Sequence, residues 1–203
     1  MHRADGILAP EVWIAGFVIT GIILAYTLYR TKAEEIPKIS LVTSAVFVAS
    51  LIHIPLGPTS VHLILAGLAG VLLAEKAYPS VFIALLLQAF LFQHGGITTI
   101  GINTVIIGVP ALVSYGIFVV GVNHTRFEQR LVIFGGLAGG VAIVLAVVLT
   151  SIALLFGGEE FLGVVALLAV AHVPVIVIEA VIVGSVVGFL NKVKPEMLAR
   201  VRE

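Results

Sequence analysis

Apolar residues fill seven long stretches of the chain, and polar residues gather between them. The stretches lie at roughly 11–30, 38–54, 60–75, 78–94, 102–122, 130–157 and 160–190. None of them alternates apolar and polar positions as a strand of a membrane barrel would. Lipid leaves no partner for unpaired backbone groups, so the pattern predicts an all-α bundle of seven transmembrane helices. The third and fourth stretches are close to the lower length limit of about 17 residues for a spanning helix.

The composition agrees with a membrane protein. Of the 203 residues, 60% are hydrophobic and 11% are charged, whereas a soluble domain carries about 25% charged residues. One helical domain over residues 1–203 accounts for the length. The chain contains no cysteine, which excludes disulfides and thiolate metal sites.

Basic residues mark one side of the predicted bundle. Ten of the eleven Lys and Arg residues follow the first, third, fifth or seventh stretch, and only Arg3 precedes the first. The positive-inside rule places the basic side in the cytoplasm. We therefore expect a multi-pass protein of the cell membrane, with its N-terminus outside and a cytoplasmic tail at 191–203.

The opening segment, MHRADGILAP, combines a terminal amine with an imidazole. It lacks the apolar core of a signal peptide, so we expect Met1 and His2 to remain in the mature chain. The amine of Met1 and two nitrogens of His2, the amide and Nδ1, can bind one ion in two chelate rings. Three nitrogens in a plane suit Ni²⁺, Cu²⁺ or low-spin Co²⁺ and leave one corner open for a second imidazole. Asp5 and Gly6 predict a turn that folds residues 1–10 back onto the bundle.

The segment HIPLGPTSVHL separates the second and third stretches and carries two imidazoles. Its prolines and glycine at 55–58 predict the end of one helix, and Thr59 or Ser60 can cap the next. We then expect His62 in the first turn of the third helix, at the outer end of the bundle. Imidazole inside a membrane protein is rare and usually functional, although a histidine at a helix start often only caps or packs.

The segment QHGGITTIGINT follows the fourth stretch, again on the expected outer side. Its glycines permit a tight or re-entrant turn. His94, Thr98 and Asn103 can supply hydrogen bonds that fix imidazole tautomers. The alternative is an ordinary glycine-rich helix connection.

The seventh stretch contains an imidazole and a carboxylate, His172 and Glu179, within the apolar run AHVPVIVIEA. The two are seven residues apart and share a helix face. A carboxylate inside a membrane is costly and is seldom without a role. Glu179 either pairs with His172 or ties the last helix to its neighbours.

These motifs resemble those of the CbiM/NikM family, the substrate-capture subunits of cobalt and nickel energy-coupling-factor transporters. The matching segments appear in the family's order over nearly the whole chain: MHRADGILAP at 1–10, PTSVHLILAG at 58–67, HGGITTIGIN at 94–103 and HVPVIVIEA at 172–180. Departures include His53, where the family usually has Asn, and His94, which replaces a carboxylate. They leave the expected ligands in place and change their surroundings.

The resemblance implies a nearly square-planar site, with the N-terminus tucked into the bundle. Its ligands would be the Met1 amine, the amide and imidazole of His2, and the imidazole of His62. The residues expected to support this site or to act structurally are Asp5, His53, Ser60, His94, Thr98, Asn103, His172 and Glu179. The bound Co²⁺ or Ni²⁺ would be the transported substrate, and no resident cofactor is expected.

The resemblance also implies a non-catalytic subunit. The chain has no phosphate-binding loop, so ATP hydrolysis is expected in two cytoplasmic ATPase partners. A transmembrane coupling subunit would connect them to this chain, often with a small accessory membrane subunit. Small residues such as Ala66, Gly67 and Gly70 are expected to face lipid or such a partner. No nucleic-acid partner is expected.

Three other functions remain open from the sequence. The first is a secondary metal transporter with a proton relay through His172 and Glu179. The second is a stand-alone membrane metalloprotein that uses Glu179 as a base. The third is a capture subunit for an organic vitamin, which would work with His2 replaced.

Overall fold

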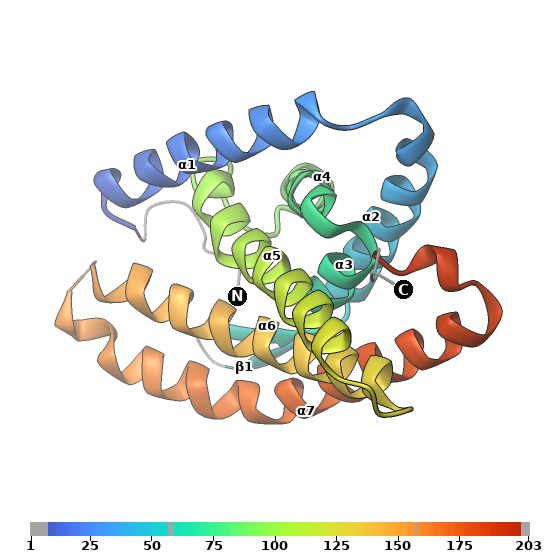
Figure 1. The fold of residues 1–203 in the computed structure, drawn as a ribbon. Coiled ribbons are helices and arrows are strands. Elements are labelled where there is room, and N and C mark those ends of the chain that lie inside the picture. Colours follow the sequence, from blue (N-terminus) through green and yellow to red (C-terminus); the bar gives the residue numbers. More distant parts are fainter. Residues whose placement is uncertain (1–7, 57–58, 157, 200–203) are drawn as a thin grey trace.

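The structure, a computed structural model, describes residues 8–56, 59–156 and 158–199 (Figure 1). Most of this chain is α-helical, in the order α1 (Pro10–Tyr29), α2 (Ile36–Leu51), α3 (Ala66–Leu73), α4 (Ala77–Phe92), α5 (Ile100–His124), α6 (Arg130–Leu155) and α7 (Leu162–Val193). Short 3₁₀ turns are η1 (Ala33–Glu35), η2 (Ala74–Lys76), η3 (Glu159–Phe161) and η4 (Pro195–Met197). Two strands, β1 (His53–Leu56) and β2 (Thr59–His62), lie between α2 and α3.

Five helical stretches among the described residues are long and apolar enough to cross a membrane. They are Pro10–Tyr29, Ala66–Phe92, Ile100–His124, Arg130–Leu155 and Leu162–Val193, the second of which joins α3, η2 and α4. Many large apolar side chains on the outer faces of these helices are exposed, as contact with lipid requires. The predicted multi-pass membrane protein is thus confirmed. The predicted count of seven spans is not, because α2 has only 16 residues and the third apolar stretch is not one helix.

The third apolar stretch begins as half of a hairpin. β1 and β2 pair antiparallel, with His53 opposite His62 and Ile54 opposite Val61. Irregular backbone at membrane depth is tolerated only where protein or water covers it. His62 and Val61 are buried, and the hairpin lies against the other elements of the bundle (Figure 1).

The helix predicted over 60–75 is therefore wrong in its first part. α3 begins at Ala66, so His62 ends a strand and does not lie in the first turn of a helix. Thr59 and Ser60 belong to β2 and do not cap a helix. The physical reason is local, because the β-branched Thr59 and Val61 favour an extended backbone.

Small residues allow α3 to lie deep between α5 and α6. A Cβ atom on Gly67 would lie 2.6 Å from the Cα of Gly139 in α6, and one on Gly70 would overlap the carbonyl oxygen of Ala111 in α5. Ala66 is fully buried as well. The expectation that Ala66, Gly67 and Gly70 face lipid or a partner is wrong, because they make the closest contacts inside the protein.

α1 meets α5 at one close crossing. A Cβ atom on Gly16 would lie 2.5 Å from the backbone nitrogen of Ile102. One turn further on, the Thr20 hydroxyl donates to the carbonyl oxygen of Gly101 (2.8 Å) and accepts from the Tyr78 hydroxyl of α4 (3.0 Å). These contacts hold α1 against the rest of the bundle.

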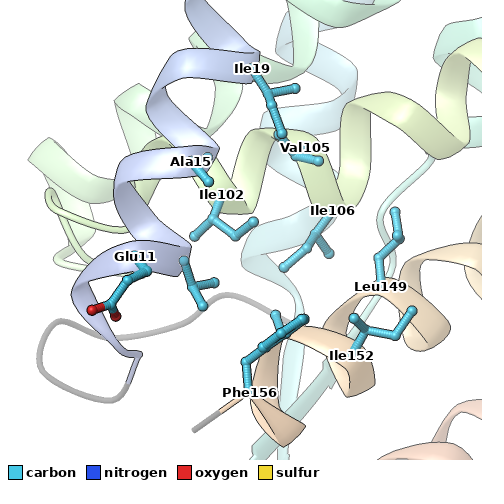
Figure 2. A pocket seen from close by; sticks show the side chains of 12 residues that line it. Glu11, Ala15, Ile19, Ile102, Val105, Ile106, Leu149, Ile152 and Phe156 are labelled. Carbon is cyan, nitrogen blue, oxygen red and sulfur yellow. The ribbon is translucent and has the colours of Figure 1, made fainter.

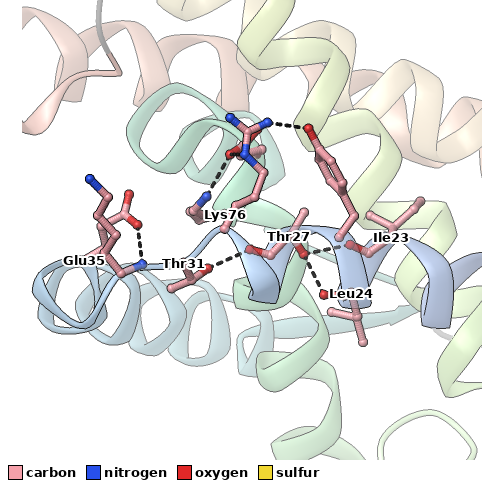
Figure 3. A network of polar contacts seen from close by, with 10 residues as sticks. Ile23, Leu24, Thr27, Thr31, Glu35 and Lys76 are labelled. Atoms are coloured by element: carbon pink, nitrogen blue, oxygen red, sulfur yellow. Dashed lines mark hydrogen bonds and ion pairs between the residues drawn. The ribbon is translucent and has the colours of Figure 1, made fainter.

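The turns that carry most basic residues lie at one end of the bundle, on the right in Figure 1. Figure 3 shows part of this basic end. The Glu75 carboxylate of η2 lies 2.8 Å from Lys76 Nζ and 3.7 Å from Arg30 Nε, which ties the end of α1 to η2. The hydroxyl of Thr31 donates to the carbonyl oxygen of Thr27 (2.8 Å), where α1 ends. The clustering of charge predicted from the sequence is therefore seen in space.

The C-terminal segment returns to the bundle. α7 runs to Val193, so the tail predicted from residue 191 begins within a helix. After η4, the Ala199 amide donates to the carbonyl oxygen of Val71 in α3 (2.8 Å). The end of the described chain therefore packs on α3 at the basic end.

Candidate metal site

His62 is a buried imidazole with one nitrogen bound to its own chain. It is 3% exposed, and its Nδ1 lies 3.1 Å from the carbonyl oxygen of Leu63. A carbonyl oxygen only accepts, so Nδ1 carries the proton. In the neutral ring this places the lone pair on Nε2, which is the nitrogen that would bind a metal ion.

His94 lies against His62. The two ring centroids are 5.9 Å apart and the ring planes meet at 79°, edge to face. The chain reaches this position because Gln93 (φ 52°) and Gly95 (φ 84°) take left-handed conformations directly after α4. The His94 amide also donates to the carbonyl oxygen of Gln88 (3.2 Å). Two residues that the sequence singled out are thus brought together, and the supporting role of His94 stays a prediction.

The turn after His94 is held by its own hydrogen bonds. Thr99 Oγ1 accepts from the Gly96 amide and donates to the Gly96 carbonyl oxygen, both at 3.2 Å. Asn103 Nδ2 in turn donates to Thr99 Oγ1 (3.2 Å). Asn103 and Thr99 are buried, whereas Thr98 is exposed. The buried hydroxyl of this turn is therefore Thr99, which the sequence did not single out from its neighbour Thr98.

A cavity of about 10 Å³ adjoins His62 on the side of α2 and α4. Its polar lining is Ser50 and Gln88, both buried. The Gln88 amide donates to Ser50 Oγ, which itself donates to the carbonyl oxygen of Phe47 (2.7 Å). Space of this size holds about one water molecule. Sequence reasoning missed both residues, although a lone amide within an apolar stretch was a usable signal.

His172 and Glu179 are fully buried in α7. His172 Nδ1 donates to the carbonyl oxygen of Leu168 (2.7 Å). Glu179 Oε1 accepts from the backbone amides of Ile64 (2.6 Å) and Leu65 (2.8 Å). Among the described residues, neither His172 Nε2 nor Glu179 Oε2 has a hydrogen-bond partner. Two roles were predicted for Glu179. In the structure it bonds to the segment that leads into α3, and it does not pair with His172.

Several predicted site residues lie outside this description. Met1, His2 and Asp5 are outside the described residues, as are the side chains of His53 and Ser60. Among the side chains that are described, no group of three or more His, Asp or Glu residues lies close enough to hold a metal ion. The ligand set of Met1, His2 and His62 thus stays a prediction.

Two grooves on the bundle are apolar. A groove of about 350 Å³ lies between α1, α5 and α6, and Figure 2 shows its aliphatic lining, with Glu11 at one edge. A second groove, of about 390 Å³, lies between α6 and α7 and is lined by aliphatic residues, alanine and glycine. Neither lining includes an imidazole among the described residues. The described imidazoles His62, His94 and His172 therefore lie outside both grooves.

A family model described as cobalt uptake substrate-specific transmembrane region matches residues 2–197. A putative metal transport protein of Haemophilus influenzae is 36% identical over 202 residues, which are 98% of both chains. A putative fused nickel transport protein NikMN of Archaeoglobus fulgidus is 28% identical, over 98% of this chain and 68% of that protein. A putative fused cobalt transport protein CbiMQ of Methanocorpusculum labreanum is 26% identical, over 97% of this chain and 36% of that protein.

The fold is also found in a solved structure. The crystal structure of a truncated transition metal transporter superposes with a TM-score of 0.83 and 24% sequence identity. The match covers 95% of this chain and 99% of that chain. The overall fold of this chain therefore exists in an experimental structure.

Proposed function

The chain belongs to the CbiM family, the cobalt uptake substrate-specific transmembrane regions, and from this we propose that it captures Co²⁺ or Ni²⁺ for an ATP-driven importer. The family consists of membrane proteins for cobalt and nickel transport. The observation that carries the proposal is His62. It is a buried imidazole whose Nδ1 donates to the carbonyl oxygen of Leu63, so that Nε2 is the nitrogen that would bind the ion.

The ion would be held by four nitrogens. Met1 supplies its amine, His2 supplies its amide and Nδ1, and His62 closes the plane with Nε2. Nitrogen ligands in a square favour Ni²⁺ and suit low-spin Co²⁺, whereas Zn²⁺ prefers a tetrahedron. Within this donor set, the Irving–Williams order makes Ni²⁺ bind more tightly than Co²⁺. Nickel is therefore the first ion to test.

Energy for transport would come from partner subunits. The chain carries no phosphate-binding loop, so a transmembrane coupling subunit and two cytoplasmic ATPases would drive it, with a small accessory membrane subunit in some complexes. The relative named CbiMQ, a fused cobalt transport protein, supports an association with a second transport component. The capture subunit itself would bind the ion and carry out no chemical reaction.

Replacement of His62 tests the site. We expect His62→Ala to weaken Ni²⁺ binding by at least about 100-fold, because loss of a direct ligand should exceed the 10–100-fold typical of outer-shell partners. Isothermal titration of the purified protein measures the affinity, and the visible spectrum reports the square-planar geometry. His124→Ala is the matched control, since His124 is exposed at the end of α5. Unchanged affinity in His62→Ala would contradict the proposal.

Capture from outside requires one orientation in the membrane. By the positive-inside rule, the basic end faces the cytoplasm and the turn between α6 and α7 faces out. Because the chain has no cysteine, single substitutions can report this directly. A membrane-impermeant maleimide added to right-side-out vesicles should label Glu160→Cys, in η3, and should label Glu128→Cys only after permeabilisation. Both residues are exposed, so the reverse pattern of labelling would show the reverse orientation.

A further inference from the structure

Glu179 is a buried carboxylate that the proposed capture of the ion does not use. It lies on α7, far along the sequence from the hairpin, and is fully buried. Its Oε1 nevertheless accepts two short hydrogen bonds from the backbone amides of Ile64 and Leu65, at 2.6 and 2.8 Å. A carboxylate inside an apolar bundle is costly unless it is well bonded, so these contacts need a physical reason.

One reason is the start of α3. The first amides of a helix have no partner within the helix and are normally bonded by a capping side chain. The residue before α3, Leu65, has no side-chain cap and takes a left-handed conformation (φ 53°). Glu179 accepts from the amide of Leu65, the N-cap residue, and from the amide of Ile64 before it. The side chain thus holds the segment that leads into α3 from another helix.

A second reason connects Glu179 to His62. The amide of Ile64 and the carbonyl of Leu63 belong to one peptide group, which is planar and rigid. The Ile64 side of that group donates to Glu179, and the Leu63 side accepts from His62 Nδ1 (3.1 Å). A single peptide plane thus joins the carboxylate of α7 to the imidazole of the hairpin.

We propose that Glu179 is a positioning residue that orients His62 for the ion through the Leu63–Ile64 peptide group. The carboxylate holds this peptide plane in one orientation. The Leu63 carbonyl oxygen, which accepts from His62 Nδ1, is then fixed as well, and this sets the direction in which His62 Nε2 points. Hydrogen bonds in such a chain also strengthen one another, and a strongly bonded Nδ1–H makes Nε2 a better donor to a metal. The proposal rests on the proposed function, because it assigns a role in binding of the same ion.

The backbone of Glu179 is itself held in place. Gly139 of α6 lies so close that a Cβ atom there would be 2.7 Å from the carbonyl oxygen of Glu179. The carboxylate therefore extends from a fixed point of the α6–α7 pair. The position of Oε1 is therefore set by two packed helices and not by a flexible loop, as a residue that orients another side chain requires.

Three substitutions separate positioning from simple stability. Glu179→Gln keeps an acceptor oxygen at the same reach, Glu179→Asp withdraws the acceptor by one methylene, and Glu179→Leu removes it. We expect the Ni²⁺ affinity of Glu179→Gln to lie within about threefold of that of the unchanged protein. Glu179→Asp and Glu179→Leu should lose about 10–100-fold in affinity, which is the range for loss of an outer-shell contact. The visible spectrum of the nickel form should shift in Asp and Leu and stay unchanged in Gln. Affinity is measured by isothermal titration.

Thr43→Val is the matched control for loss of a buried polar contact. Thr43 Oγ1 donates to Ser80 Oγ (2.9 Å) between α2 and α4, so this variant should lower thermal stability and leave the nickel affinity and spectrum unchanged. If Glu179→Leu does not fold, the Asp and Gln variants still decide. The role of Glu179 would be overturned if Glu179→Asp and Glu179→Gln bound nickel with equal affinity, or if the nickel spectrum of Glu179→Asp were unchanged. Failure of the unchanged protein to bind nickel would instead overturn the proposed function.

Discussion

A Gly-Pro dipeptide added before Met1 should abolish high-affinity nickel binding, with a loss of at least about 100-fold. The addition converts the terminal amine of Met1 into a peptide amide, so the five-membered chelate ring that includes this amine is lost. Proline is the second added residue because its nitrogen carries no proton in a peptide, so the new terminal amine cannot form a continuous chelate with His2. Isothermal titration gives the affinity, and the visible spectrum should lose the band of a square-planar nickel centre.

The same dipeptide placed after Glu203 is the control. It adds equal mass at the other end of the chain and should leave nickel affinity unchanged. If the N-terminally extended protein binds nickel as tightly as the control, the opening residues are not ligands. The buried nitrogen and oxygen atoms of α7, His172 Nε2 and Glu179 Oε2, would then be the next donors to test.

Gly70→Ala should destabilise the protein by about 3 kcal/mol, the upper end of the range for overpacking. The added methyl group would overlap the carbonyl oxygen of Ala111, and backbone atoms on packed helices cannot move aside as a side chain can. For a chain of this size the melting temperature should fall by about 6–12 °C. A thermal unfolding curve in detergent measures the change.

Gly116→Ala is the matched control for this substitution. Gly116 lies inside α5, and a Cβ atom there would meet nothing within 4 Å. Alanine favours a helix over glycine by roughly 0.5–1 kcal/mol, so this variant should be as stable as the unchanged protein or slightly more stable. A similar loss of stability in both variants would show that α3 is not packed as closely as the structure indicates.

The long apolar helices could be predicted from the sequence, because only buried or lipid-facing helices carry 20 or more apolar residues in a row. α1, α5, α6 and α7 all fall within a few residues of the predicted stretches. The hairpin could not be predicted in the same way. A short apolar run such as 60–75 fits a strand and a helix equally well by periodicity. The prolines and glycine at 55–58 mark a break, but they do not determine whether a strand or a helix comes after it.

The surroundings of His62 were only partly predictable for a related reason. Glu179 was recognised as a costly polar group in a membrane, which is a property of the residue alone, and His94 was recognised as a candidate support from the glycine-rich turn that carries it. Their partners depend on tertiary structure. The amides of Ile64 and Leu65 have no signature in the sequence, and they lie more than one hundred residues before the carboxylate that they contact. Gln88 was missed because the sequence does not show that this single amide of the fourth apolar stretch lies beside His62.

The contacts of α1 determine where residues 1–9 join the bundle. Gly16 is six residues from Pro10, about 9 Å along the helix axis at 1.5 Å per residue. The crossing at Gly16, the hydrogen bonds of Thr20 and the contact of Arg30 with η2 hold this helix at three levels. Residues 1–9 are attached at Pro10, so the segment that carries Met1 and His2 starts from an anchored helix end.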